Sequence, residues 1–171
     1  GLLVAASGVA ATDPAVTGVA YDSRRVAPGH VFVALRGQHA DGSAFVAQAV
    51  EQGAVGIVSE ALPSGSAPWA QVADGRLALA HLAVAFHGDP SSRMQVVGIT
   101  GTNGKTTTAY LLSSVFEAAG TRCGMLGTVT YRVGGEVREA TRTTPEAPDV
   151  QALLAEMAAH QCGACVMEVS S

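Results

Sequence analysis

The sequence has 171 residues, of which 48% are hydrophobic and 14% are charged, and its formal net charge is −4. This composition excludes a disordered chain, and without a basic block the charge gives no footprint for nucleic acid. No run of about 20 apolar residues is present, so we expect neither a membrane span nor a membrane partner. The expectation is a soluble cytoplasmic protein that acts as a monomer.

The three cysteines are an odd number, which does not suggest a disulfide framework. Cys162 and Cys165 form a single C-x-x-C pair without a second ligand pair or a thioredoxin-like context, so neither a zinc site nor a redox motif is indicated. Because Cys165 opens the apolar run Cys165-Val166-Met167, we expect buried strand cysteines.

Residues 1–90 are predicted to form one domain. The N-terminus has neither an initiator Met nor a basic leader and is interpreted as a clipped domain start. The predicted elements are an opening segment at 17–23, strands at 31–35, 54–59 and possibly 71–73, a helix that Ser43 caps and Gly53 ends, and a helix at 75–86 that Asp74 caps. The breaker cluster at 88–92 marks the boundary.

Residues 91–171 are predicted to form the start of a second domain. Its predicted elements are strands at 95–100, 123–126 and 164–169, helices at 105–119 and 148–160, and a hairpin at 129–139 around Gly134-Gly135. Alternating strands and helices indicate a parallel α/β sheet. Three core strands are too few for an ordinary doubly wound sheet, so we interpret the chain as a fragment.

A glycine-rich loop joins the strand at 95–100 to the next helix, and it reads Thr100-Gly101-Thr102-Asn103-Gly104-Lys105-Thr106. Backbone N–H groups at such a helix start, together with a lysine ammonium, bind phosphate groups. The strict pattern G-x-x-x-x-G-K-[ST] requires glycine at position 99, where this sequence has Ile, so the loop is a variant. We predict a nucleoside triphosphate site; the alternative is a loop in which Lys105 only caps a turn.

Five motifs, in the expected order, resemble the Mur ligase family, which builds the peptide stem of bacterial cell wall. Tyr21-Asp22-Ser23-Arg24 with residues 28–37 resembles its UDP-sugar-binding domain, and residues 97–108 resemble its ATP loop. Three further motifs are similar to the member that adds the third residue of the stem, and they are Leu126-Gly127-Thr128, Thr143-Thr144-Pro145-Glu146 and Met167-Glu168-Val169-Ser170-Ser171.

The resemblance implies a fold, a reaction and partners. The fold would be a small α/β UDP-sugar-binding domain at 1–90, followed by the first part of a P-loop-type parallel α/β ATP-binding domain at 91–171. The reaction would join UDP-N-acetylmuramoyl-L-Ala-D-Glu to a diamino acid, meso-diaminopimelate or L-Lys, through an acyl phosphate made with ATP and Mg²⁺. A lysine expected to be carbamylated and the C-terminal domain would lie beyond Ser171, so the isolated chain is expected to be inactive.

The resemblance also assigns roles to single residues. Lys105 and Glu168 would be catalytic, and Thr106 and Glu168 would hold Mg²⁺. The phosphate-binding set would be Gly101, Thr102, Asn103, Gly104, Lys105, Thr106 and Thr107. The substrate-binding set would be Tyr21, Ser23, Gln38, His39, Ala40, Thr143, Thr144 and Ser170.

Plainer interpretations stay open for several of these residues. Glu168 could be a solvated carboxylate at a strand end, and His39 could be an exposed loop histidine. Thr143 and Thr144 could cap the following helix, whereas Asp22 and Arg24 could shape their turn through local hydrogen bonds.

Two other functions also stay open. The chain could belong to another ligase with this loop, such as the Mur member that adds D-Ala-D-Ala, cyanophycin synthetase or folylpolyglutamate synthase. It could instead be a P-loop NTPase that needs no acceptor.

Overall fold

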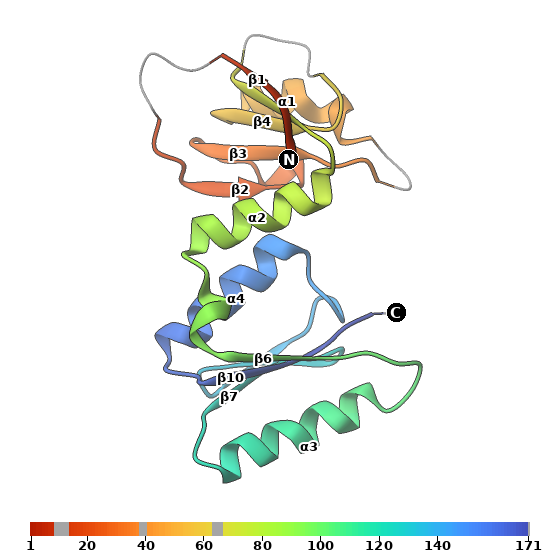
Figure 1. Ribbon diagram of the computed structural model, residues 1–171, viewed down its shortest axis with the longest axis vertical. Coiled ribbons are helices and arrows are strands. Elements are labelled where there is room, and N and C mark those ends of the chain that lie inside the picture. Colours follow the sequence, from red (N-terminus) through yellow and green to blue (C-terminus); the bar gives the residue numbers. More distant parts are fainter. Residues whose placement is uncertain (9–13, 38–40, 63–66, 171) are drawn as a thin grey trace. The chain divides into compact units, whose positions relative to one another are not determined.

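The computed structural model describes residues 1–8, 14–37, 41–62 and 67–170. The chain divides into two compact units, Gly1–Phe86 and His87–Ser171. The predicted α/β class is confirmed, because each unit has a mixed sheet rich in parallel strands with helices packed on it (Figure 1). None of the helices in the described part of the chain has the length and apolar character needed to cross a membrane.

The first unit contains a five-stranded sheet in the order β1-β5-β4-β3-β2. The strands are β1 (Leu3–Ser7), β2 (Gly18–Ala20), β3 (His30–Ala34), β4 (Gly56–Ser59) and β5 (Trp69–Val72). Strands β2 to β5 pair in parallel, whereas β1 adds an antiparallel edge to β5. Strand β1 was not predicted, because Leu3-Val4-Ala5-Ala6-Ser7 has no alternation of apolar and polar residues to recognise.

Two helices cover the two faces of this sheet. Alternation along β3 sends Phe32 to the face packed by α1 (Val46–Glu51) and Val33 to the face packed by α2 (Gly75–His87). Asp74 caps α2 as predicted, since its carboxylate accepts the N–H of Leu77 at 2.9 Å.

The prediction that Ser43 caps the first helix is wrong. The carboxylate of Asp41 accepts the N–H of Ser43 and caps the short 3-10 helix η2 (Gly42–Phe45). Helix α1 follows it from Val46, and Phe45 stays exposed. Another 3-10 helix, η1 (Ser23–Arg25), follows β2.

The second unit contains a five-stranded sheet in the order β6-β10-β7-β8-β9. The strands are β6 (Gln95–Ile99), β7 (Cys123–Leu126), β8 (Thr130–Val133), β9 (Glu136–Glu139) and β10 (Ala164–Glu168). Strands β6, β10 and β7 are parallel, and β8 and β9 form the predicted hairpin. Gly134 and Gly135 both have positive φ, 58° and 98°, which a tight two-residue hairpin turn requires.

Helices α3 (Lys105–Ala118) and α4 (Ala147–Ala159) lie on opposite faces of this sheet (Figure 1), and η3 (Pro90–Arg93) precedes β6. Ala109 of α3 packs with Val166, whereas Met157 of α4 packs with Cys165. The predicted burial of Cys162 and Cys165 is confirmed, although Cys162 precedes the strand. Burial raises the pKa of the Cys165 thiol to about 12.

The parallel register determines where a site can form. The pairings Glu168↔Ile99 and Met167↔Leu126 align the carboxyl ends of β6, β10 and β7. The segments that leave these three ends are therefore neighbours, and open α/β sheets bind ligands at this edge.

Candidate functional site: a phosphate cradle beside a buried carboxylate

The predicted glycine-rich loop leaves β6 and enters α3. Gly101 and Gly104 have φ values of 145° and 80°, which favour glycine, and Gly104 is the N-cap residue of α3. The first N–H groups of α3 have no acceptor one turn earlier and face the loop, as at every helix start. The ammonium of Lys105 donates to the carbonyl of Gly101 at 2.6 Å and so lies over the loop. Backbone donors and one cation are thus gathered at a positive helix end.

Glu168 ends β10 beside this loop and is 1% exposed. Its Oε2 accepts the hydroxyl of Thr106 at 3.0 Å, which connects the carboxylate to the first turn of α3. Thr128 also contacts this carboxylate, since its N–H donates to Oε1 and its hydroxyl donates to Oε2, each at 3.0 Å. The alternative of a solvated strand-end carboxylate is therefore wrong.

The loop, the helix start and the carboxylate enclose a small open cavity of about 210 Å³. Its lining residues are Thr102, Asn103, Gly104, Lys105, Thr106, Thr107, Thr128 and Glu168. The volume suits phosphate groups better than a whole nucleotide, since pockets for complete small molecules usually exceed about 300 Å³. All predicted phosphate-binding residues except Gly101 line this cavity directly.

The oxygen donors in this cavity fit Mg²⁺. A carboxylate and a hydroxyl are hard ligands of the kind that this ion prefers, and it usually keeps several waters and substrate phosphates as further ligands. The Thr106 hydroxyl uses its single proton on Glu168, so its lone pairs stay available to a cation. The described residues include no cluster of three or more His, Cys, Asp and Glu side chains that could hold a metal alone.

The predicted substrate residues Thr144 and Ser170 lie together at the end of β10. Thr144 Oγ1 accepts the N–H of Ser170 at 2.9 Å and also contacts the Ser170 hydroxyl and the carbonyl of Glu168. Neither Thr143 nor Thr144 caps α4, whose N-cap residue is Glu146. Thr144 therefore ties its loop to the strand end, and contact of this loop with substrate stays a prediction.

Tyr131 holds the same loop from the other side. This β8 side chain is buried, and its hydroxyl donates to the carbonyl of Arg142 at 2.6 Å while accepting the N–H of Arg142 at 3.2 Å. One phenol thus fixes both backbone groups of the residue before Thr143. The sequence did not single out Tyr131, because a tyrosine in a strand is usually a core residue.

Tyr21 and Ser23 follow the carboxyl end of β2 in the first unit. Ser23 is buried and its hydroxyl donates to Gln48 of α1 at 3.0 Å. Asp22 and Arg24 shape the turn, which was the alternative left open for them, because Asp22 accepts hydrogen bonds from the backbone N–H and the guanidinium of Arg24. The hydrogen bond from the Arg24 guanidinium lowers the pKa of Asp22 to about 2.

The remaining predicted UDP-sugar residues, Gln38, His39 and Ala40, lie outside the described residues. Their roles, including the alternative of an exposed loop histidine, stay predictions.

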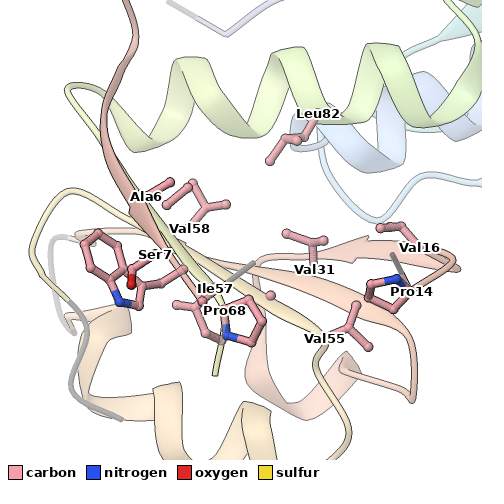
Figure 2. Close-up of a pocket in the computed structure, with 14 residues that line it drawn as sticks. Ala6, Ser7, Pro14, Val16, Val31, Val55, Ile57, Val58, Pro68 and Leu82 are labelled. Atoms are coloured by element: carbon pink, nitrogen blue, oxygen red, sulfur yellow. The ribbon is translucent and has the colours of Figure 1, made fainter. Parts of the chain in front are cut away.

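A larger cavity of about 690 Å³ lies in the first unit, and Figure 2 shows its apolar lining. Val31, Val55 and Ile57 line it from the amino-terminal parts of β3 and β4, and Leu82 of α2 closes one side. This cavity is at the opposite end of the strands from Tyr21 and Ser23. Of the side chains that line it, only those of Ser7 and Trp69 carry a polar atom.

Comparisons with known proteins identify the family of this chain. A family model described as Mur ligase middle domain matches residues 99–171, and one described as Mur ligase family, catalytic domain matches residues 15–87. The UDP-N-acetylmuramoyl-L-alanyl-D-glutamate--2,6-diaminopimelate ligase of Solibacter usitatus is 49% identical over 91% of this chain and 32% of its own length. The UDP-N-acetylmuramyl-tripeptide synthetase of a Roseiflexus species is 47% identical over 93% of this chain and 32% of its own length.

Solved structures show the same fold. A UDP-N-acetylmuramoyl-L-alanyl-D-glutamate--2,6-diaminopimelate ligase matches with a TM-score of 0.75 and 23% identity, over 91% of this chain and 32% of that one. MurF from Acinetobacter baumannii matches with a TM-score of 0.61 and 26% identity, over 91% of this chain and 31% of that one. The chain thus spans about a third of the length of the relatives it matches. With two family models in order along it, the chain belongs to the Mur ligase family and carries its N-terminal and middle domains.

Proposed function

We propose that the protein is an ATP-dependent ligase of peptidoglycan synthesis that joins a diamino acid to UDP-N-acetylmuramoyl-L-Ala-D-Glu. The observation that carries the proposal is the phosphate cradle of Lys105 and Thr106 next to the buried Glu168. Relatives whose names state this kind of activity share 47% and 49% of their residues with the chain over the matched part. A cytoplasmic location belongs to the proposal, since that compartment supplies ATP.

The proposed chemistry has two steps. A carboxylate is a poor acylating agent, so the γ-phosphoryl group of ATP is first transferred to the D-Glu carboxylate, which gives an acyl phosphate and ADP. The amine of the diamino acid then attacks the acyl carbon, the amide bond forms, and phosphate leaves with a proton lost from the amine. Positioning and charge neutralisation supply most of the acceleration in phosphoryl transfer.

The residues of the phosphate cradle have different roles in this phosphoryl transfer. The N–H groups at the start of α3 and the loop from Gly101 to Gly104 bind phosphate oxygens, and the Lys105 ammonium neutralises charge that builds on the outer phosphates. Thr106 and Glu168 would hold Mg²⁺, which would neutralise further phosphate charge when bound. Glu168 also orients the Thr106 hydroxyl by accepting its proton.

The UDP-peptide substrate is assigned to the two remaining residue groups. Tyr21 and Ser23 at the end of β2, with Gln38, His39 and Ala40, would bind the uridine diphosphate end. Thr143 and Thr144 of the loop before α4 would bind the muramoyl-peptide end together with Ser170, which follows β10 and contacts Thr144. This assignment places the acceptor carboxylate near the phosphates.

A mutation pair tests the proposed site in the complete gene product. Lys105→Ala is expected to lower ATP turnover at least 100-fold, because it removes the one cation lying over the described loop. Arg122→Ala is the matched control, since it removes an exposed cation whose guanidinium donates to the carbonyl of His160. Phosphate release with all substrates present is the measurement, and equal activity of the two variants would contradict the proposal.

A further inference from the structure

The motif Leu126-Gly127-Thr128 has no role in the reaction described so far. It follows the carboxyl end of β7, and the pairing Leu126↔Met167 brings it next to Glu168. The N–H of Gly127 donates to the carbonyl of Thr130 at 3.0 Å, which closes a tight turn between β7 and β8. This turn points its backbone and one hydroxyl at the carboxylate.

Thr128 forms hydrogen bonds with both oxygens of that carboxylate. Its N–H donates to Oε1 and its hydroxyl donates to Oε2, each at 3.0 Å. The Thr106 hydroxyl donates to the same Oε2 at 3.0 Å. Among the described residues, two of the three hydrogen bonds to the Glu168 carboxylate thus come from Thr128, one from its backbone N–H and one from its hydroxyl, which fixes the rotation of the carboxylate and sets Oε2 toward the start of α3.

Gly127 makes this close approach possible. A Cβ at this position would lie 2.9 Å from Oε1 of Glu168 and 3.2 Å from the carbonyl oxygen of Thr130. Any larger residue would therefore push the carboxylate or the turn away. Gly127 and Thr128 together therefore fix the position of the Glu168 carboxylate.

We infer that Thr128 is a positioning residue, which holds Glu168 in the orientation that lets Thr106 and Glu168 hold Mg²⁺ with the nucleotide phosphates. This inference rests on the proposed function. Thr128 acts through Glu168, as outer hydrogen-bond partners do at metal sites, where their loss typically costs about 10- to 100-fold in metal affinity or activity. A purely structural role would instead change only folding stability.

The test is nucleotide binding by the complete gene product, measured by calorimetry with ADP in the presence and absence of Mg²⁺. Thr128→Val keeps the shape of the side chain and its N–H but loses the hydroxyl that donates to Oε2. We expect it to lower the affinity for ADP with Mg²⁺ at least about tenfold, and to leave the affinity without Mg²⁺ unchanged. Thr128→Ser keeps the hydroxyl and is expected to bind like the wild type.

Thr130→Val is the matched control, because it removes a hydroxyl from the same turn that contacts Tyr110 rather than Glu168. Should Thr128→Val fail to fold, Thr128→Ala removes the same hydroxyl with less bulk and is judged by the same criterion. Equal affinities of wild type and variant with Mg²⁺, or an equal loss with and without Mg²⁺, would overturn the inference. Failure of the proposed function is separate, since it appears as wild-type protein without acceptor-dependent ATP turnover.

Discussion

The hydroxyl of Tyr131 offers a sharp test of how the loop before α4 is held. Tyr131→Phe removes one oxygen and leaves the carbonyl and the N–H of Arg142 without their partner. Each such hydrogen bond contributes about 1 kcal/mol net, and leaving a group unpaired costs up to about 3 kcal/mol when it is buried. Because Arg142 is exposed, water can partly replace the phenol, and the expected cost is about 1–2 kcal/mol.

Urea unfolding of the 171-residue chain, followed by circular dichroism, measures this cost. With an m-value of roughly 2 kcal/mol/M, the midpoint is expected to fall by about 0.5–1 M. Tyr110→Phe is the matched control, because Tyr110 is 42% exposed and its hydroxyl contacts Thr130 at the surface. Its midpoint is expected to change by less than about 0.3 M. Equal shifts in the two variants would refute the idea that Tyr131 fixes the loop.

Three further predictions concern other parts of the chain. Thr144→Ala leaves the N–H of Ser170 without its acceptor. It is expected to raise the KM for the UDP-dipeptide about five- to tenfold in steady-state kinetics. An unchanged KM would contradict a role of this loop in substrate binding. Arg24 lowers the pKa of Asp22 to about 2, so the stabilisation from the ionised Asp22 is present above pH 4 and is lost as the pH falls to 2. The urea midpoint of the wild type should therefore exceed that of Asp22→Asn at pH 6 but not at pH 2. The three thiols are buried, and burial raises the pKa of Cys165 to about 12. They should therefore resist iodoacetamide at pH 8 in the folded chain and react in urea, and mass spectrometry can count the alkylated cysteines.

The sequence was most informative where one physical effect dominates. The strand Cys123–Leu126 was predicted at its observed bounds because a short apolar run follows a helix that ends in glycine, and all four of its residues are buried. The turn at Gly134 and Gly135 was predicted because only glycine adopts two successive positive φ angles cheaply. The cradle was predicted because a glycine-rich turn between a strand and Lys105 has few other uses.

The sequence was least informative where a contact depends on strand register. Edge strand β1 is nearly all exposed, and the Asp41 cap competed with Ser43 only two residues away. The grip of Thr128 on Glu168 joins residues 40 positions apart, and it exists only because β7 and β10 are neighbours in a given register. The motif Leu126-Gly127-Thr128 was recognised in the sequence, but its contact with Glu168 could not be predicted from it.

The most direct test of the central claim is phosphate release by the complete gene product, measured with ATP, Mg²⁺ and UDP-N-acetylmuramoyl-L-Ala-D-Glu. Meso-diaminopimelate and L-Lys are supplied in separate reactions, and a further reaction offers D-Ala-D-Ala with the UDP-tripeptide. The proposed ligase should release phosphate only when the UDP-dipeptide and one diamino acid are both present. Release with no acceptor would identify an NTPase, and release only with D-Ala-D-Ala would identify the other kind of Mur ligase; either result would contradict the proposed function.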